Sequence, residues 1–505
     1  MSEPLPRRPV RAAFTWLLAI VALAAIILSV VKLEEGRAGV QISELAIGTT
    51  PATLYRKGTT DGPLVIVAHG FAGSRQLMQA YSLTLAQSGY TVLAFDFEGH
   101  GRNPVPMSGN VDSIEGTTAL LVAETRRVIA AGRQMTDPLR GVALLGHSMA
   151  TDVIIRAALE EAAVGTPVRG VVAISMFSVA ITATQPPALL AISGAWEGAL
   201  RAAALDALHQ VDPDAGEGET ADAGGVVRRA VAAPSVEHVG VLYSATALRE
   251  TRAWLDRVFD FQGTGPILQP GGWILLLLAG VVALLKPLTR LLPSRRAALA
   301  GISAGRFWLA VLVPAIAVPL VCTALYVRFL PVLVADYLMV HLAAYGVLQL
   351  LLLRVWRLGR PGFSWAGMLL LVVWGIAVFG LAMDRYVASY VPNIGRLAVM
   401  AALAVGTVPF MVADSILTES GEGRGWQRIV ARVGLLASIA AAAMLDPERL
   451  MFLFIILPVL LLFFLVQGLM GRWVGQRSGP VTAGIGLGVC LAWALAVSFP
   501  QFQAG

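Results

Sequence analysis

Cysteine, lysine and charged residues in general are scarce in this chain of 505 residues. The only cysteines, Cys322 and Cys490, fall inside apolar runs of membrane length, so the sequence predicts neither a disulfide framework nor a thiolate metal site. We expect both to be small packing residues. Lysine occurs only at Lys32, Lys57 and Lys286, and the net charge of +6 therefore comes from arginine.

Charged residues make up 14% of the chain and hydrophobic residues 56%, which is too apolar for a protein that is soluble throughout. Residues from about 40 to 262 have the mixed composition of a globular domain, whereas residues from about 266 to 505 are mostly long uncharged runs. We predict a cytoplasmic tail and anchor over residues 1–38, a globular domain over residues 39–263 and a membrane domain over residues 264–505. The arginines cluster at the ends of apolar runs, which indicates membrane topology and predicts no nucleic-acid partner.

The first apolar run predicts a membrane anchor. Arg7, Arg8 and Arg11 precede the uncharged residues 12–31. At about 1.5 Å per residue, a helix of this run is long enough to cross a hydrocarbon core of about 30 Å. A cleaved signal peptide would end in small residues at a cleavage site, but Lys32 and two glutamates follow here. We predict an uncleaved anchor with a cytoplasmic N-terminus, because positive charges resist translocation.

From residue 40 onward, segments with the period of strands alternate with segments that have the period of helices. The predicted strands are residues 40–47, 52–57, 64–68, 91–95, 142–145, 170–175, 188–193 and 226–231. The predicted helices are residues 76–88, 112–134, a helix from 151 onward, 199–209 and about 245–261. The acidic residues 212–222 fail the spacing of a calcium loop, and we expect a solvated loop there. The alternation implies crossover units on a mainly parallel sheet, which is an α/β fold.

The segment Gly146-His147-Ser148-Met149-Ala150 follows a predicted buried strand and turns sharply into a helix. Ser148 lies at the tip of this turn, which forces its backbone into a sparsely populated region and requires small neighbours two positions away. Gly146 and Ala150 satisfy that requirement. The last position of the segment is Ala150 where the G-x-S-x-G pattern has a glycine. A methyl group must therefore fit between the helix and the strand.

With these motifs, residues 40–262 resemble the α/β-hydrolase superfamily. The resemblance rests on residues that follow predicted strands in the family's order: His69-Gly70 after the third, Gly99-His100-Gly101 after the fourth, Ser148 after the fifth, Glu197 after the seventh and His238 after the eighth. It implies the α/β-hydrolase fold. About a dozen residues separate the sixth and seventh strands, where many relatives insert a lid, so we expect no lid insertion and a shallow, open site.

The resemblance also implies a serine nucleophile that is served by a histidine and an acid. A serine hydroxyl is a poor nucleophile at neutral pH and needs a base that takes its proton. We expect His238 to be that base and to return the proton to the leaving group. We expect Glu197 to fix the tautomer of the imidazole, with Asp212 and Asp214 in the following loop as alternatives.

The backbone N–H groups of Phe71 and Met149 are the expected oxyanion hole. Met149 follows the nucleophile at a helix N-terminus, and Phe71 lies in the loop after the third strand. Three nearby histidines have plainer interpretations. We expect His147 to pack behind the nucleophile, and we expect His69 and His100 to hold loops by hydrogen bonds.

The C-terminal half predicts about eight further membrane spans. They are residues 266–285, 307–327, 332–353, 365–383, 397–413, 429–445, 450–470 and 481–499. Most arginines fall on alternate connections, beginning with the one that contains Arg290 and Arg296, and such connections stay cytoplasmic. This orientation agrees with that of the anchor. We therefore predict a multi-pass protein of a bacterial inner membrane whose globular domain is periplasmic or extracellular.

Asp336 and His341 lie within one predicted span, where ionisable groups are functional candidates by default. A transport or proton-relay role is one interpretation. The other places Asp336 at the outer interface and satisfies His341 by a hydrogen bond from a neighbouring helix.

Together these features predict a membrane-anchored serine esterase, or lipase-like hydrolase, that works through an acyl-enzyme and needs no metal or organic cofactor. The expected partners are a small-molecule or lipid ester substrate and the membrane lipids; the sequence identifies no protein partner. Two alternatives stay open. One is a serine peptidase, for which Glu98 is the candidate anchor of a substrate amine, and the other is a non-catalytic sensing module attached to a membrane transporter.

Overall fold

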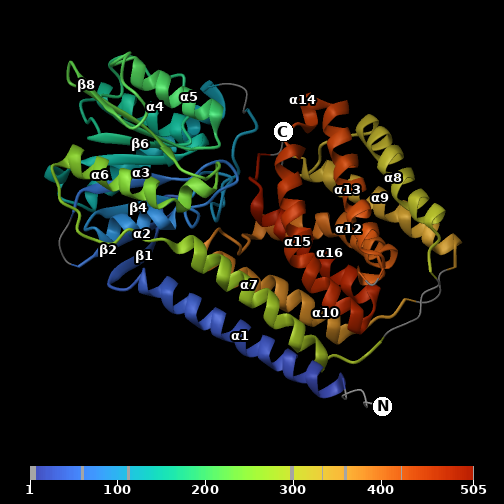
Figure 1. Ribbon diagram of the computed structural model, residues 1–505. Coiled ribbons are helices and arrows are strands. Elements are labelled where there is room, and N and C mark those ends of the chain that lie inside the picture. The colour runs from blue at the N-terminus through green and yellow to red at the C-terminus, as the bar shows by residue number, and fades with distance from the viewer. Residues whose placement is uncertain are drawn as a thin grey trace.

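The computed structural model describes residues 7–58, 62–110, 114–295, 301–332, 334–357, 361–421 and 423–503, with the side chains of residues 7–12 and 421 excepted. A sheet region and a helical region lie side by side, and two long helices, α1 (Arg7–Glu35) and α7 (Pro270–Leu288), run together from the sheet region along one edge of the helical region (Figure 1). The side chains of Arg7, Arg8 and Arg11, the predicted helix start at Asp112, and Arg296 lie outside the described residues.

The sheet region contains nine strands in the order β1-β2-β4-β3-β5-β6-β7-β9-β8. Their bounds are β1 (Val40–Ile47), β2 (Thr50–Lys57), β3 (Leu64–Ala68), β4 (Thr91–Phe95), β5 (Val142–His147), β6 (Gly170–Ile174), β7 (Ala188–Gly194), β8 (Thr220–Ala223) and β9 (Val226–Ala233). The pairs from β4 through β3, β5, β6 and β7 to β9 are parallel, and the outer pairs are antiparallel. The predicted mainly parallel sheet is confirmed.

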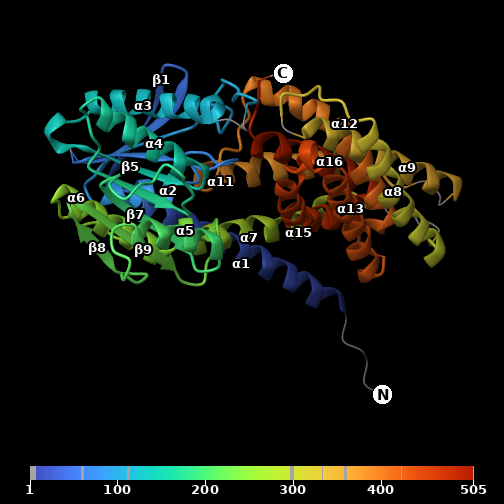
Figure 2. The same cartoon turned by 90° about the horizontal axis from the view of Figure 1, so that it is seen from above.

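Helices cover both faces of the sheet, because the central strands are apolar on both sides. Leu64 and Ile66 pack on the face covered by α3 (Ala119–Gln134) and α4 (Met149–Ala163). Val65 and Val67 point the other way, toward α2 (Gln79–Gln87) and α6 (Ala245–Phe259). Figure 2 shows α3 and α6 on opposite sides of the strands. The remaining helix of this region is α5 (Gly198–His209).

One predicted loop is wrong in part. Residues 220–223 at the end of the acidic stretch form β8, which pairs antiparallel with β9. Gly224 and Gly225 make the two-residue turn between them, both with positive φ. The predicted eighth strand is therefore β9, and His238 follows β9.

Nine helices among the described residues are long and apolar enough to cross a membrane. The first is α1, and eight belong to the C-terminal half, as predicted. The bounds of the latter are α7 (Pro270–Leu288), α8 (Ala304–Ala324), α9 (Ala335–Val355), α10 to α11 with a π-helical turn between them (Trp365–Tyr386), α12 (Ile394–Leu417), α13 (Gly425–Leu445), α15 (Leu453–Ser478) and α16 (Pro480–Ser498). The short α14 (Pro447–Leu450) lies between α13 and α15.

Alternate connections of the helical region gather at its two ends. At the end beside the sheet region, the Phe502 N–H donates to Pro331 O over 2.7 Å, and the Ser389 N–H donates to Ser74 Oγ over 3.0 Å. At the opposite end, the Arg295 N–H donates to Arg477 O over 3.0 Å. The helices therefore run up and down between one end that contacts the sheet region and one that faces away from it.

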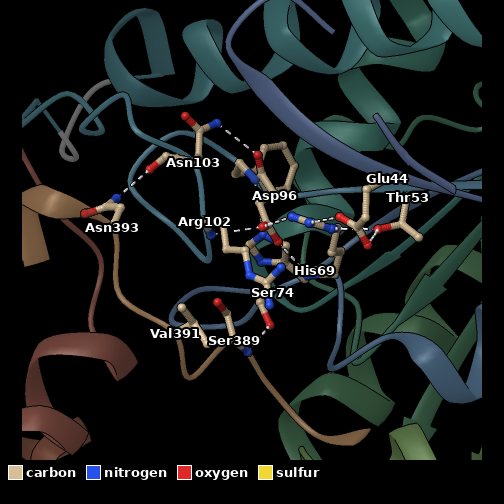
Figure 3. A network of polar contacts seen from close by, with 12 residues as sticks. Glu44, Thr53, His69, Ser74, Asp96, Arg102, Asn103, Ser389, Val391 and Asn393 are labelled. Atoms are coloured by element: carbon tan, nitrogen blue, oxygen red, sulfur yellow. Dashed lines mark hydrogen bonds and ion pairs between the residues drawn. The ribbon is translucent and has the colours of Figure 1, made fainter. Parts of the chain in front are cut away.

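Polar contacts join the two regions around Asp96, at the end of β4 (Figure 3). Asp96 forms an ion pair with the buried Arg75 and accepts from the Arg102 N–H. Arg102 in turn forms an ion pair with Asp384 of the helical region. Asn393 donates to Asn103 O over 3.2 Å. The loops that follow β3 and β4 are thus held by contacts from the helical region.

The tail after α16 also binds the loop that follows β4. The Gln501 N–H donates to Gly99 O, and the Met107 N–H donates to Gln501 O, both over 2.8 Å. The buried Arg396 of α12 donates to Gly99 O over 2.9 Å. Residues 99–107 therefore lie between the sheet and the helical region.

Candidate active site

Ser148 lies between the end of β5 and the start of α4, with φ 56° and ψ −121°. Small neighbours allow this strained turn. A Cβ on Gly146 would lie 2.9 Å from Ile154 Cδ1, and a Cβ on Gly70 would lie 3.0 Å from Ser148 Cβ. Ala150 is fully buried, so its methyl group is accommodated between helix and strand. The predicted sharp turn at Ser148 is present.

His238 and Glu197 reach Ser148 from two other strand ends. His238 Nε2 is 2.8 Å from Ser148 Oγ, and His238 Nδ1 is 2.6 Å from Glu197 Oε1. His238 follows β9, and Glu197 follows β7. Because parallel strands end at one edge of the sheet, the three segments meet although they are remote in sequence. Asp212 and Asp214, the alternative acids, are not bonded to His238.

Two further donors fix the second carboxylate oxygen of Glu197. Oε2 accepts from the Gly194 N–H over 2.6 Å and from Ser175 Oγ over 2.7 Å. Burial disfavours the charged form, but the hydrogen bonds from His238, Gly194 and Ser175 outweigh it and lower the pKa of the Glu197 carboxyl. The acid is therefore ionised at neutral pH and presents one oxygen to the imidazole.

Ser175 is a site residue that the sequence analysis missed. It directly follows β6, at the same edge of the sheet as Ser148, and has φ 52°. A serine at the carboxyl end of a buried strand was the available signal, although serines are common in loops.

Phe71 and Met149 both line the cavity beside Ser148. Met149 is the first residue of α4, so its N–H has no acceptor within the helix. Gly73 folds back on the loop that carries Phe71, because its N–H donates to Gly70 O over 3.0 Å. The role of both N–H groups as an oxyanion hole stays a prediction.

The three nearby histidines make structural contacts. His147 Nε2 is 2.9 Å from His238 O, and burial together with the charge of His238 lowers the pKa of His147 to about 4. His69 Nδ1 is 2.8 Å from Gly70 O, and its Nε2 accepts from the Phe97 N–H. His100 Nδ1 is 2.8 Å from Glu98 O. None of the three bonds to Ser148, which leaves His238 as the candidate base.

A cavity of about 620 Å³ opens beside Ser148 and His238. Its walls are mostly apolar and include Phe71, Met107, Leu121, Phe177 and Phe452. The β6–β7 connection contains no helix, so no lid is inserted there. Ile114, Thr117 and Thr118, together with Phe452 of the helical region, supply further parts of the cavity walls.

Phe452 is the second site residue that the sequence analysis missed. It belongs to the connection between α14 and α15, and its ring centroid is 5.8 Å from that of Phe71. The helical region therefore supplies part of the cavity wall next to the candidate oxyanion donor. No pattern in the sequence indicates this contact, because it depends on how the two regions pack.

The other candidates lie elsewhere or are satisfied by neighbours. Glu98 lies 3.6 Å from Arg127 and does not line the cavity. Asp336 accepts from Tyr326, Phe329 and Tyr337 near the sheet-region end, and His341 lies between Tyr337 and Ser438. Among the residues that the structure describes, no group of three His, Cys, Asp or Glu side chains could hold a metal ion.

Residues 61–204 match the model of the family described as "Serine aminopeptidase, S33" (Hydrolase_4). With the sheet order above, this part of the chain is an α/β-hydrolase domain. The matched residues contain Ser148 and Glu197 but end before His238. No curated protein matches the chain.

Several solved structures are similar to slightly less than half of this chain. The Thermus thermophilus protein TT1662 is 20% identical, with 44% of this chain and 99% of that chain covered and a TM-score of 0.32. Dienelactone hydrolase from Anabaena variabilis is 17% identical, with 45% and 100% covered and a TM-score of 0.33. A hormone-sensitive lipase from a metagenome library is 15% identical, with 49% and 98% covered and a TM-score of 0.33.

Proposed function

We propose that this chain is a membrane-embedded serine hydrolase that cleaves carboxylic ester bonds through Ser148, His238 and Glu197. One observation carries the proposal. Ser148 Oγ, His238 and Glu197 form a continuous pair of hydrogen bonds of 2.8 and 2.6 Å at one edge of the sheet. Candidate nucleophile, base and orienting acid thus have the mutual geometry that acyl transfer needs.

In the proposed mechanism, Ser148 attacks the ester carbonyl while His238 takes the hydroxyl proton. Glu197 stabilises the imidazolium without taking the proton. The N–H groups of Phe71 and Met149 receive the negative charge on the former carbonyl oxygen, a contribution worth about 3 kcal/mol per donor in other hydrolases. His238 then protonates the leaving alcohol. In the second half of the reaction, His238 takes a proton from a water molecule, the water attacks the acyl-enzyme, and Ser148 leaves with the proton that His238 returns.

The cavity favours an ester with an apolar acyl group. The one acid among its described lining residues, Asp152, is engaged by Arg156 over 2.7 Å and by Ser178 over 2.6 Å. Phe452 places the helical region against the cavity, so an amphiphilic substrate could enter from a bilayer surface. A lipid ester is therefore the preferred substrate class.

We further propose the predicted division into residues 1–38, 39–263 and 264–505, with the hydrolase domain outside the membrane. Nine spans from a cytoplasmic N-terminus put residues 499–503 on the outer side, where Gln501 contacts the hydrolase loops. The connections that gather at the sheet-region end share that side, and the arginine-rich connections share the other.

The family description "serine aminopeptidase" favours peptide hydrolysis as the second candidate. An aminopeptidase needs an acid that anchors the substrate amine. Glu98 is outside the cavity, and Asp152 is already paired with Arg156. The described lining therefore lacks an uncommitted acid, which favours the ester.

A fluorophosphonate probe tests the nucleophile directly. We expect covalent labelling of the detergent-solubilised full-length protein and its loss in Ser148→Ala. Thr118→Ala is the matched control, because it removes a hydroxyl from the lining of the same cavity and should still be labelled. Labelling that persists in Ser148→Ala would mean that another residue is the nucleophile, which contradicts the proposal. Absence of labelling in the wild type would also contradict it and would favour the non-catalytic sensing module.

A panel of p-nitrophenyl esters and aminoacyl p-nitroanilides then separates the two hydrolase candidates. We expect turnover of esters, with higher kcat/KM for longer acyl chains. Preferred cleavage of the anilides would assign the site to peptides.

A further inference from the structure

A second cavity lies in the helical region, at the end that faces away from the sheet region. Its volume is about 180 Å³, and it is bounded by α12, α13, α15 and α16. Arg428, Arg432 and Arg472 line it, together with Ser415, Thr418 and Ser420. Asp414 is the one acid in the described lining. The cavity thus has a surplus of positive charge.

Few acceptors serve these arginines among the residues that the structure describes. Asp414 is 3.8 Å from Arg432, and Arg432 also lies over the Phe464 ring at 4.9 Å. Arg432 and Arg472 are close enough to Arg428 for their charges to repel it. The buried Nε atoms of all three arginines, and Ser420 Oγ, have no hydrogen-bond partner in the described part of the chain.

Such an arrangement is costly unless an anion completes it. Partly buried like charges repel one another, and buried donors without acceptors lose their hydration without compensation. A phosphate group offers several oxygens at once, and the planar guanidinium fork matches it. A carboxylate offers only two oxygens to three guanidinium groups and a hydroxyl.

The surroundings favour a phospholipid as the source of the phosphate. Leu465 and Leu469 also line the cavity and are 62% and 36% exposed. They lie on α15, so an acyl chain could follow this helix while the headgroup occupies the cavity. Basic pockets between membrane helices on the cytoplasmic side are suited to anionic headgroups.

We propose that the cavity bounded by Arg428, Arg432 and Arg472 binds the phosphate group of an anionic phospholipid. The proposal rests on the proposed membrane location and is independent of the catalytic role of Ser148. The site is distinct from the candidate active site, because it lies at the opposite end of the helical region.

Binding is measured by native mass spectrometry and calorimetry on the full-length protein in a neutral detergent. Every protein carries Ser148→Ala, so that no ligand is hydrolysed and a failed esterase assignment leaves the result intact. The probes are dioctanoyl phosphatidylglycerol, dioctanoylglycerol, which lacks the phosphate, and inorganic phosphate. We expect binding of the phosphatidylglycerol and none of the dioctanoylglycerol.

The double substitution R428Q/R472Q should weaken phosphatidylglycerol binding by at least about tenfold, because two charge-assisted contacts are lost. Arg354→Gln, an exposed arginine near the same end of the helical region, is the matched control and should stay within about twofold. R428K/R472K keeps the positive charges but loses the planar guanidinium groups, so it should bind phosphatidylglycerol more weakly than wild type. This variant tests the site if R428Q/R472Q does not fold.

The three probes separate the sources of the phosphate. Binding of inorganic phosphate but not of the lipid would place a soluble anion in the cavity and overturn the lipid. Binding of neither phosphate probe, or an affinity unchanged in a folded R428Q/R472Q and in R428K/R472K, would overturn the site itself.

Discussion

The sheet region and the helical region contribute side chains to the candidate site in different ways. In the sheet region, Ser148, His238 and Glu197 follow strands whose parallel order brings their ends together, and each bonds to another. In the helical region, the side chains that reach the site or the other region, such as Phe452 and Asp384, lie at helix ends and connections. Sheet topology thus fixes a site in advance, whereas helix packing creates contacts that only the assembled molecule has.

The largest expected effect is a loss of kcat/KM on substitution in the sheet region that substitution in the helical region does not cause. His238→Ala should lower kcat/KM for a p-nitrophenyl ester by about 10⁴-fold, because the base is lost. Asp336→Asn, which alters a buried acid of the helical region, should change it by less than about threefold. The measurement is steady-state hydrolysis of the purified proteins. A comparable loss in Asp336→Asn would break the comparison.

A smaller effect should show where the helical region does contribute. Phe452→Ala should reduce kcat/KM for a dodecanoyl ester by about tenfold, because an apolar wall of the cavity is removed. The acetyl ester does not reach that wall and should be affected little. Phe454→Ala, an exposed phenylalanine of α15, is the control. Equal losses for both esters would make Phe452 a purely structural residue.

The lowered pKa of Glu197 predicts a pH dependence of stability. A carboxyl whose pKa is lower in the folded state stabilises the fold above its unfolded pKa, about 4.5, and loses this contribution as the pH falls through its folded pKa. Glu197→Gln should therefore be less stable than wild type at pH 7, and this difference should shrink toward acid pH. Thermal unfolding from pH 7 to pH 3 measures it, with the exposed Glu160→Gln as control. A difference independent of pH would contradict the prediction.

The smallest effect concerns the joint between the regions. Arg102 and Asp384 are partly exposed, so their coupling energy in a double-mutant cycle should be about 1 kcal/mol or less. Thermal unfolding of Arg102→Ala, Asp384→Ala and the double variant gives this coupling. A much larger coupling energy would contradict the expectation that this ion pair contributes little to stability.

Much of the sheet region could be predicted because it obeys local rules. Continuous apolar strands alternate with helices, and the small residues around Ser148 indicate the sharp turn. β8 was missed because Thr220–Ala223 has little apolar character, although Gly224-Gly225 is a typical hairpin turn. The long apolar helices of the C-terminal half were predictable from length and hydropathy alone.

The missed parts depend on tertiary packing. Ser175 becomes a partner of Glu197 only when β6 and β7 lie side by side. Phe452 and the arginine cavity depend on how several helices pack, which periodicity does not specify. The ion pair between Arg75 and Asp96, in the loops after β3 and β4, is equally invisible in the sequence, because the two residues lie in separate segments.

The contact of Gln501 with Gly99 and Met107 has a consequence for biosynthesis. A ribosome makes Ser148 and the loop over residues 99–107 long before it makes the tail that binds this loop. During that interval Met107, which borders the cavity, lacks the backbone partner that holds it. We expect the cavity beside Ser148 to be incomplete in a nascent chain, and hydrolysis to begin only after α16 and the tail that follows it have folded.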